Sequence, residues 1–236
     1  MIEEQKIIAV PYDQLLPMQC CMPLRVLNLY AGIGGNRKHW QSVQVTAVEH
    51  NEEIAAIYQE YYAKDKVIIG DAHEYLLKHY KEFDFIWTSP PCQTHSRATF
   101  WGGSRGTNRH PKFIDFKLWQ EIIFLSNYST CKYVVENVVP YYEPFVKPSC
   151  EIQRHLFWAN FNIKPTKLKE PEFNLLKVSA NDTVYGVSLK GRKMKHRKDA
   201  ILRNMVNPDL GLYIFEQAKG IIRSENISQV SLFEGW

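Results

Sequence analysis

Three glycines directly after a short apolar run are the feature that most constrains this chain. The run Arg25–Tyr30 has the composition of a buried strand, and Gly32, Gly34 and Gly35 follow it. Glycine has no Cβ, so the backbone of such a turn can approach a ligand closely. A strand that ends in a glycine turn is typical of α/β folds that bind ligands at the carboxyl ends of their strands.

The following residues continue this alternation of strands and helices. Further strands are predicted at 44–49, 67–70, 83–88, 132–138 and 156–161, and helices at 52–62, 74–80, 116–128 and 200–222. Strands that alternate with helices predict a doubly wound, mostly parallel sheet.

The chain of 236 residues suits one compact domain with a small appendage. We divide it into an N-terminal extension (1–22), a catalytic domain (23–162), a short target-recognition region (163–198), C-terminal helices that return to the catalytic domain (199–223) and a tail (224–236).

Charge and cysteine content narrow the class of protein. The net charge of +4 permits a polyanionic partner without requiring one. The five cysteines show no zinc-binding spacing, so we expect no metal. No stretch approaches the roughly 18 apolar residues of a membrane span, and the N-terminus is acidic where a signal peptide would be positive. We therefore expect a soluble, cytoplasmic protein with no membrane partner.

Two acidic residues end the second and third predicted strands. Glu49 could accept hydrogen bonds from both hydroxyls of a ribose, and Asp71 could reach an adenine amino group. The alternative is that both are solvated acids at strand ends. The chain lacks the glycine-rich signatures that bind phosphates, which favours an adenosyl ligand without a phosphate tail, such as S-adenosylmethionine.

Two further residues suggest chemistry at the same edge of the sheet. Cys92 follows two prolines just beyond a predicted strand, although a lone cysteine is usually a small buried apolar residue. Glu136 interrupts an apolar strand, where a carboxylate is costly unless it is paired or has a task. It could protonate a heterocycle, or it could simply face solvent from an edge strand.

These motifs together resemble the cytosine-C5 DNA methyltransferase family, and in particular its compact, phage-like members. The resemblance rests on the segments 29–35, 90–93, 136–138, 152–158 and 203–206, with Glu49 and Asp71 between them. It implies the Rossmann-like fold of class I S-adenosylmethionine-dependent methyltransferases, here with a very short target-recognition region. It also implies a restriction-modification-like enzyme that acts on double-stranded DNA.

The resemblance assigns roles to individual residues. Cys92 would attack C6 of a flipped-out cytosine, Glu136 would hold or protonate N3, and Arg154 would bind the base carbonyl oxygen. His50 stands where many relatives carry an aromatic residue that stacks on adenine. The residues expected to bind S-adenosylmethionine are Tyr30, Gly32, Ile33, Gly34, Gly35, Glu49, His50, Asp71, Ala72, Pro91, Asn204 and Met205.

Two segments are candidates for contact with DNA. The loop 94–109 contains glycines, arginines and Trp101, a composition that suits a lid over DNA, and the basic run 190–198 could grip phosphates. Each could instead be a solvated surface loop. The residues expected to contact DNA are Gln93, Ser96, Arg97, Arg105, Arg109, Arg192, Lys193, Lys195 and Arg197.

The tail suggests a partner, and two other functions remain open. Gln229–Phe233 looks like the peptide by which bacterial proteins dock on the DNA sliding clamp, although it could also be an amphipathic end that packs on the domain. One alternative function is a tRNA cytosine-C5 methyltransferase. The other is a catalytically weak DNA-binding or clamp-associated module.

Overall fold

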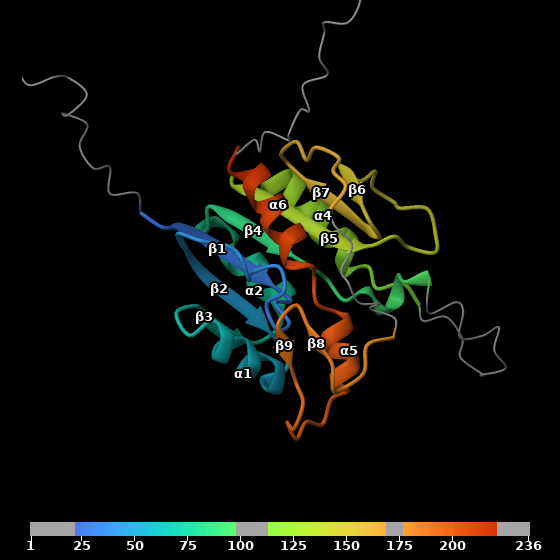
Figure 1. Cartoon of the computed structure of the whole chain (residues 1–236). Coiled ribbons are helices and arrows are strands. Elements are labelled where there is room, and N and C mark those ends of the chain that lie inside the picture. Colours follow the sequence, from blue (N-terminus) through green and yellow to red (C-terminus); the bar gives the residue numbers. More distant parts are fainter. Residues whose placement is uncertain (1–21, 98–112, 169–176, 221–236) are drawn as a thin grey trace, which may run out of the picture.

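The computed structural model describes residues 22–97, 113–168 and 177–220 (Figure 1). Several sequence predictions lie outside these residues. They are the N-terminal extension up to residue 21, the DNA contacts Arg105 and Arg109 together with Trp101, and the clamp motif Gln229–Phe233.

A seven-stranded sheet forms the centre of the molecule and confirms the predicted doubly wound architecture. Its strands are β1 (Leu24–Leu29), β2 (Val43–Glu49), β3 (Lys66–Ile69), β4 (Phe85–Thr88), β5 (Lys132–Val138), β6 (Cys150–Ile152) and β7 (His155–Ala159). The order is β3-β2-β1-β4-β5-β7-β6, and β1 to β5 pair in parallel. Leu29 lies beside both Val48 and Thr88, so the strand ends that meet at the order reversal are level.

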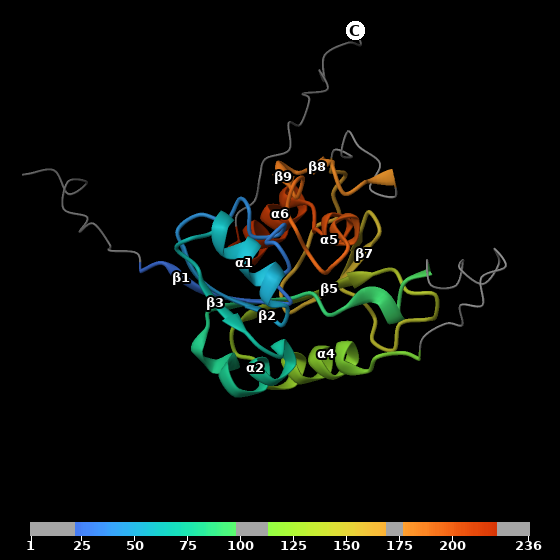
Figure 2. The ribbon, with the colours of Figure 1, turned by 90° about the horizontal axis from the view of Figure 1, so that it is seen from below.

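Helices cover both faces of the sheet. α2 (Ala72–His79) and α4 (Lys117–Tyr128) lie on one face, and α1 (Glu52–Tyr61), α5 (Lys198–Arg203) and α6 (Pro208–Ala218) lie on the other (Figure 2). The first face buries Leu76 and Leu125 against the sheet, and the second buries Leu210 and Phe215. Each helix has an apolar stripe at helical period. Burial of these stripes against the sheet produces both helical layers.

Side-chain caps fix where two helices begin beside the site. The Oδ1 atom of Asn51 accepts a hydrogen bond from the Ile54 backbone N–H at 3.1 Å and caps α1. Asp71 caps α2 in the same way through the Glu74 N–H, at 3.1 Å. Each cap satisfies a backbone donor that the helix itself cannot.

Two predicted elements need correction. The predicted strand 156–161 is β7, and it pairs antiparallel with both β5 and the unpredicted strand β6. The helix predicted over 200–222 is two helices, α5 and α6. The side chain of Asn207 caps α6 by accepting the Asp209 N–H at 2.9 Å. Pro208 lies in the first turn of α6, and because proline has no N–H, α5 cannot continue through this position.

The described part of the predicted target-recognition region packs against the catalytic domain. Its hairpin, β8 (Thr183–Val184) and β9 (Val187–Ser188), buries Val184 and Val187 in one cluster with Ile33 and Ile57. The domain boundaries themselves stay predictions. No helix within the described ranges combines the length and apolar character needed to cross a membrane.

Candidate active site

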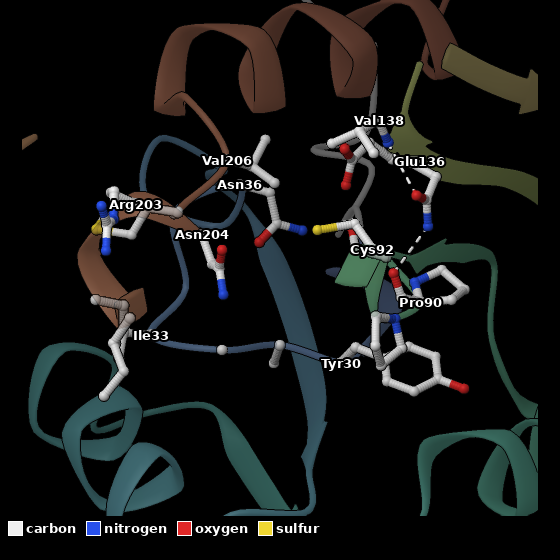
Figure 3. Close-up of a pocket in the computed structure, with 18 of the residues that line it drawn as sticks. Tyr30, Ile33, Asn36, Pro90, Cys92, Glu136, Val138, Arg203, Asn204 and Val206 are labelled. Carbon is white, nitrogen blue, oxygen red and sulfur yellow. Dashed lines mark hydrogen bonds between the residues drawn. The ribbon is translucent and has the colours of Figure 1, made fainter. Parts of the chain in front are cut away.

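A cavity of about 460 Å³ opens at the carboxyl ends of the parallel strands. Cys92 and Glu136 lie on one side of it, and Ile33, Arg203 and Asn204 lie on the other (Figure 3). The predicted site residues that line the cavity are Tyr30, Gly32, Ile33, Gly35, Glu49, His50, Pro91, Cys92, Gln93, Ser96, Glu136, Arg154, Asn204 and Met205.

Glu49 is fixed in place by backbone donors from two loops. Its Oε2 atom accepts the Gly32 N–H at 3.0 Å, and its Oε1 atom accepts the Asn51 N–H at 3.0 Å. Each carboxylate oxygen has two lone pairs, and the backbone donors use one on each. This geometry suits a pair of neighbouring hydroxyls. His50 stands exposed at the rim, with Nδ1 3.1 Å from Glu49 Oε1.

The glycine turn packs tightly against other parts of the chain. A Cβ on Gly35 would lie 2.4 Å from the carbonyl oxygen of Val206, and one on Gly34 would lie 2.2 Å from the ring of Tyr62. Only glycine allows these approaches. Because Gly35 has no side chain, the segment that carries Asn204 and Met205 can approach the turn and line the cavity. Gly34 does not line the cavity and has a packing role.

Asp71 and Ala72 do not line the cavity. Besides capping α2, Asp71 accepts a hydrogen bond from Lys117 Nζ at 3.0 Å through its Oδ2 atom. Ala72, the first residue of α2, is buried in the core. Adenine contact by these two residues stays a prediction.

Cys92 begins a short 3-10 turn, η3 (Cys92–Thr94), directly after Pro91. Its carbonyl oxygen accepts backbone hydrogen bonds from His95 at 3.0 Å and Ser96 at 2.9 Å, which fix the turn. Burial and the negative charge of Glu136 raise the pKa of the Cys92 thiol to about 11, and the Arg154 charge opposes them. The thiol is therefore protonated at neutral pH, and nucleophilic attack requires loss of that proton.

Glu136 is buried in β5 and faces the cavity. The nearest charged or titratable group across the sheet is His155, whose Nε2 lies 3.6 Å from Glu136 Oε1. Burial lowers the pKa of His155; the Glu136 charge opposes this and the Arg154 charge adds to it, so this imidazole is neutral at pH 7. The next residue, Asn137, donates from Nδ2 to the Pro90 carbonyl at 2.9 Å and ties β5 to the Cys92 loop (Figure 3).

Arg154 occupies the two-residue turn between β6 and β7. Gln153, the other turn residue, has a positive φ of 57°, which the tight reversal requires. The Arg154 carbonyl accepts the Val139 N–H at 3.0 Å, so the turn is attached to the end of β5. The hairpin thus brings a guanidinium to the cavity beside Glu136 and Cys92.

The predicted DNA contacts divide into two groups. Gln93 and Ser96 line the cavity, whereas Arg97 donates from Nε to the Pro140 carbonyl at 3.2 Å. The described basic residues 192–197 do not line it. Arg192 pairs with Glu60, with one N–O distance of 2.9 Å, and Arg197 pairs with Asp199 at 2.6 Å. Lys195 donates its backbone N–H to Glu53, and Lys193 is exposed nearby. DNA contact by all seven stays a prediction.

The sequence interpretation missed five polar residues that line the cavity: Asn36, Ser89, Asn137, His155 and Arg203. Asn36 donates from Nδ2 to the Oδ1 atom of buried Asn28 at 2.8 Å. An asparagine inside the apolar strand β1 is a signal that could have found this pair. Among the described residues, no cluster of three or more His, Cys, Asp or Glu side chains could hold a metal ion.

Comparison with known proteins gives one clear match. Residues 24–140 match the family described as C-5 cytosine-specific DNA methylase. No curated protein matches the chain.

Several solved structures are similar to part of this chain, at low TM-scores. They include a SAM-dependent methyltransferase from Agrobacterium tumefaciens, with 17% identity over 51% of this chain and 40% of that chain and a TM-score of 0.35. A putative methyltransferase from Escherichia coli has 15% identity over 58% and 75%, with a TM-score of 0.38. A mutant of DNMT2 from Spodoptera frugiperda has 23% identity over 49% and 35%, with a TM-score of 0.33. The chain thus spans less than half of the first and third.

Proposed function

Because residues 24–140 place this chain in the C-5 cytosine-specific DNA methylase family, we propose that it transfers a methyl group from S-adenosylmethionine to C5 of cytosine in DNA. One observation carries the proposal. Cys92, Glu136 and Arg154 share a single cavity with the glycine turn and Glu49, although these five features come from five separate segments of the chain.

The cofactor half of the cavity fits an adenosyl group. Glu49 offers its carboxylate oxygens to the ribose hydroxyls, and the backbone of the glycine turn allows close approach. Ile33, Met205 and Ile54 supply apolar walls. When bound there, S-adenosylmethionine supplies an electrophilic methyl group.

The other half of the cavity supplies the groups for addition to the base. Loss of the Cys92 proton to solvent gives a thiolate, and its Sγ forms a bond to C6 of cytosine. The electron pair of the C5–C6 double bond then becomes available at C5, while Glu136 protonates or hydrogen-bonds N3. Arg154 binds the carbonyl oxygen on which negative charge accumulates.

The remaining steps restore the aromatic ring. C5 would take the methyl group, whose bond to sulfur breaks to leave S-adenosylhomocysteine, and a base would then remove the proton that C5 still carries. The electron pair left behind re-forms the C5–C6 double bond and breaks the Sγ–C6 bond, which regenerates the thiolate. C6 is out of reach inside a duplex, so the cytosine must rotate out of the stack into the cavity.

The test measures methyl transfer to two nucleic acids in parallel. The wild-type protein and the Cys92→Ala variant are incubated with tritiated S-adenosylmethionine and either a random-sequence DNA duplex or tRNA. Cys131→Ala is the matched control, because Cys131 does not line the cavity. Bisulfite sequencing then locates any modified cytosine.

Label in DNA that depends on Cys92 and survives in Cys131→Ala supports the proposal. Label only in tRNA would mean that the substrate is RNA and not DNA. Label in neither nucleic acid would refute methyl transfer to cytosine. A duplex with 5-fluorocytosine at the modified site tests the covalent step, because fluorine at C5 cannot be removed as a proton. The protein should then remain bound to DNA on a denaturing gel.

A further inference from the structure

The fully buried carboxylate of Glu121 lies in the apolar layer between α4 and the sheet. Its side chain has 0% exposure, and its helical neighbours Leu118, Ile122 and Leu125 pack into the core. A buried carboxylate is costly unless hydrogen bonds satisfy it. An apolar residue of similar volume would fill the position without that cost. Such a replacement is often neutral or stabilising.

Three donors from three segments satisfy this carboxylate. Its Oε1 atom accepts the Tyr30 hydroxyl at 2.6 Å and faces His73 Nδ1 at 3.0 Å. Its Oε2 atom accepts the Thr88 hydroxyl at 2.7 Å. Glu121 thus joins the end of β1, the start of α2 and the end of β4 at one point.

Each of the two hydroxyl donors adjoins a different half of the cavity. Tyr30 lines the cavity and begins the glycine turn, with its hydroxyl pointing away from the cavity (Figure 3). Its φ of 54° lies in the left-handed region, which is unfavourable for an aromatic residue and requires support from its surroundings. Thr88 ends β4 and precedes the segment Ser89–Cys92.

We propose that Glu121 is a positioning residue that holds the cofactor turn at Tyr30 and the catalytic loop after Thr88 in a fixed relation. The inference rests on the proposed methyl transfer, because it concerns the alignment of the two halves of that site. Glu121 itself does not line the cavity, so it acts only through the residues that it holds.

The test compares Glu121→Gln and Glu121→Leu with the wild type. Glutamine keeps the shape but replaces one acceptor oxygen with a donor, so one of the three donors loses its partner. Leucine removes the buried charge and leaves all three donors without an acceptor. Three quantities are measured: the melting temperature, the Kd for S-adenosylhomocysteine by calorimetry without DNA, and kcat for methyl transfer.

We expect both variants to remain folded, with the Kd raised by about tenfold and kcat lowered by a similar factor. Thr88→Val should lower kcat more than it weakens cofactor binding, and Tyr30→Phe should do the reverse. The matched control is Tyr58→Phe, which removes a buried tyrosine hydroxyl bonded at 2.8 Å to the Asp65 carboxylate, away from the cavity. It should lower the melting temperature without changing the Kd.

Two results would overturn the inference. One is an unchanged Kd and kcat in folded Glu121→Leu, which would leave Glu121 only a structural role. The other is equal changes in Kd for Tyr30→Phe and Tyr58→Phe, which would make the effect a general loss of stability. A wild type that binds the cofactor but methylates no cytosine refutes the proposed reaction instead, and the Kd comparison then still tests the link to Tyr30.

Discussion

The Oε1 atom of Glu136 lies 3.6 Å from the Nε2 atom of His155 across the β5–β7 pair. Burial is the main cause of the lowered pKa of His155. The Glu136 charge opposes this shift, and the Arg154 charge adds to it. The unfolded chain therefore binds a proton, near the ordinary histidine pKa of about 6.5, that the folded chain does not bind. Folding stability contributed by this neutral imidazole is present at higher pH and is lost as pH falls through that value.

The corresponding experiment measures the free energy of unfolding in urea at pH 7.5 and pH 5.5. We expect the wild type to lose more stability on acidification than His155→Phe, because phenylalanine has no proton to bind. Equal losses in the two proteins would contradict the assignment of a neutral, buried His155.

The Glu136 charge should slow alkylation of Cys92. Burial is the larger cause of the raised thiol pKa of about 11, and the Glu136 carboxylate is the second. Glu136→Gln removes the second cause, so the thiolate fraction at pH 8 should increase and iodoacetamide should react faster, by about two- to tenfold. Mass spectrometry of the Cys92 peptide measures the rate. Glu151→Gln, on the exposed side of β6, should leave it unchanged; a slower rate in Glu136→Gln would contradict the prediction.

Glu49→Gln should weaken cofactor binding while the fold is retained. The two carboxylate oxygens of Glu49 accept one backbone N–H each. Glutamine has only one acceptor oxygen, and its amide nitrogen only donates, so it cannot accept both N–H groups and the ribose hydroxyls. We expect the Kd for S-adenosylhomocysteine in calorimetry to rise by about tenfold. Glu52→Gln, at the exposed start of α1, serves as the control. Equal affinities of Glu49→Gln and wild type would remove Glu49 from the binding site.

Gly211→Ala should destabilise the fold although alanine favours helices. A Cβ at this position of α6 would lie 2.4 Å from the Asn36 carbonyl oxygen, so the helix or the turn must move. Such overpacking costs about 1–3 kcal/mol, which exceeds the gain of about 1 kcal/mol from helix propensity. Chemical denaturation measures the change. Gly70→Ala, where a Cβ would meet nothing within 4 Å, should change stability by less than about 0.5 kcal/mol.

The sequence predicted well which residues meet at the cavity, because parallel strands end together. Thr88 pairs with Val135, so the loop that holds Cys92 and the strand position of Glu136 had to meet. Two helices separate β1 from β4 in the chain. The end of each strand could still be predicted, because an apolar run marks each strand. The glycine turn and Glu49 are found for the same reason.

Contacts between distant segments could not be read from local patterns. Tyr30 and Glu121 are 91 residues apart, and Glu121 sits where helical periodicity predicts an apolar residue. Likewise, nothing near Arg192 indicates that Glu60, 132 residues earlier, would bind its guanidinium. The hairpin of β6 and β7 escaped prediction because a strand of three residues is too short for an alternating pattern.

The contact between the glycine turn and the last helix has a consequence for the order in which the protein matures. Trp40 Nε1 donates to the Gly211 carbonyl at 3.1 Å across 171 residues, and Gly35 packs on Val206. A growing chain that has left the ribosome only as far as β7 has every strand of the seven-stranded sheet but lacks one wall of the cavity. Capacity to hold a ligand therefore arises only after residues 201–211 have emerged and docked, which makes it a late event in biosynthesis.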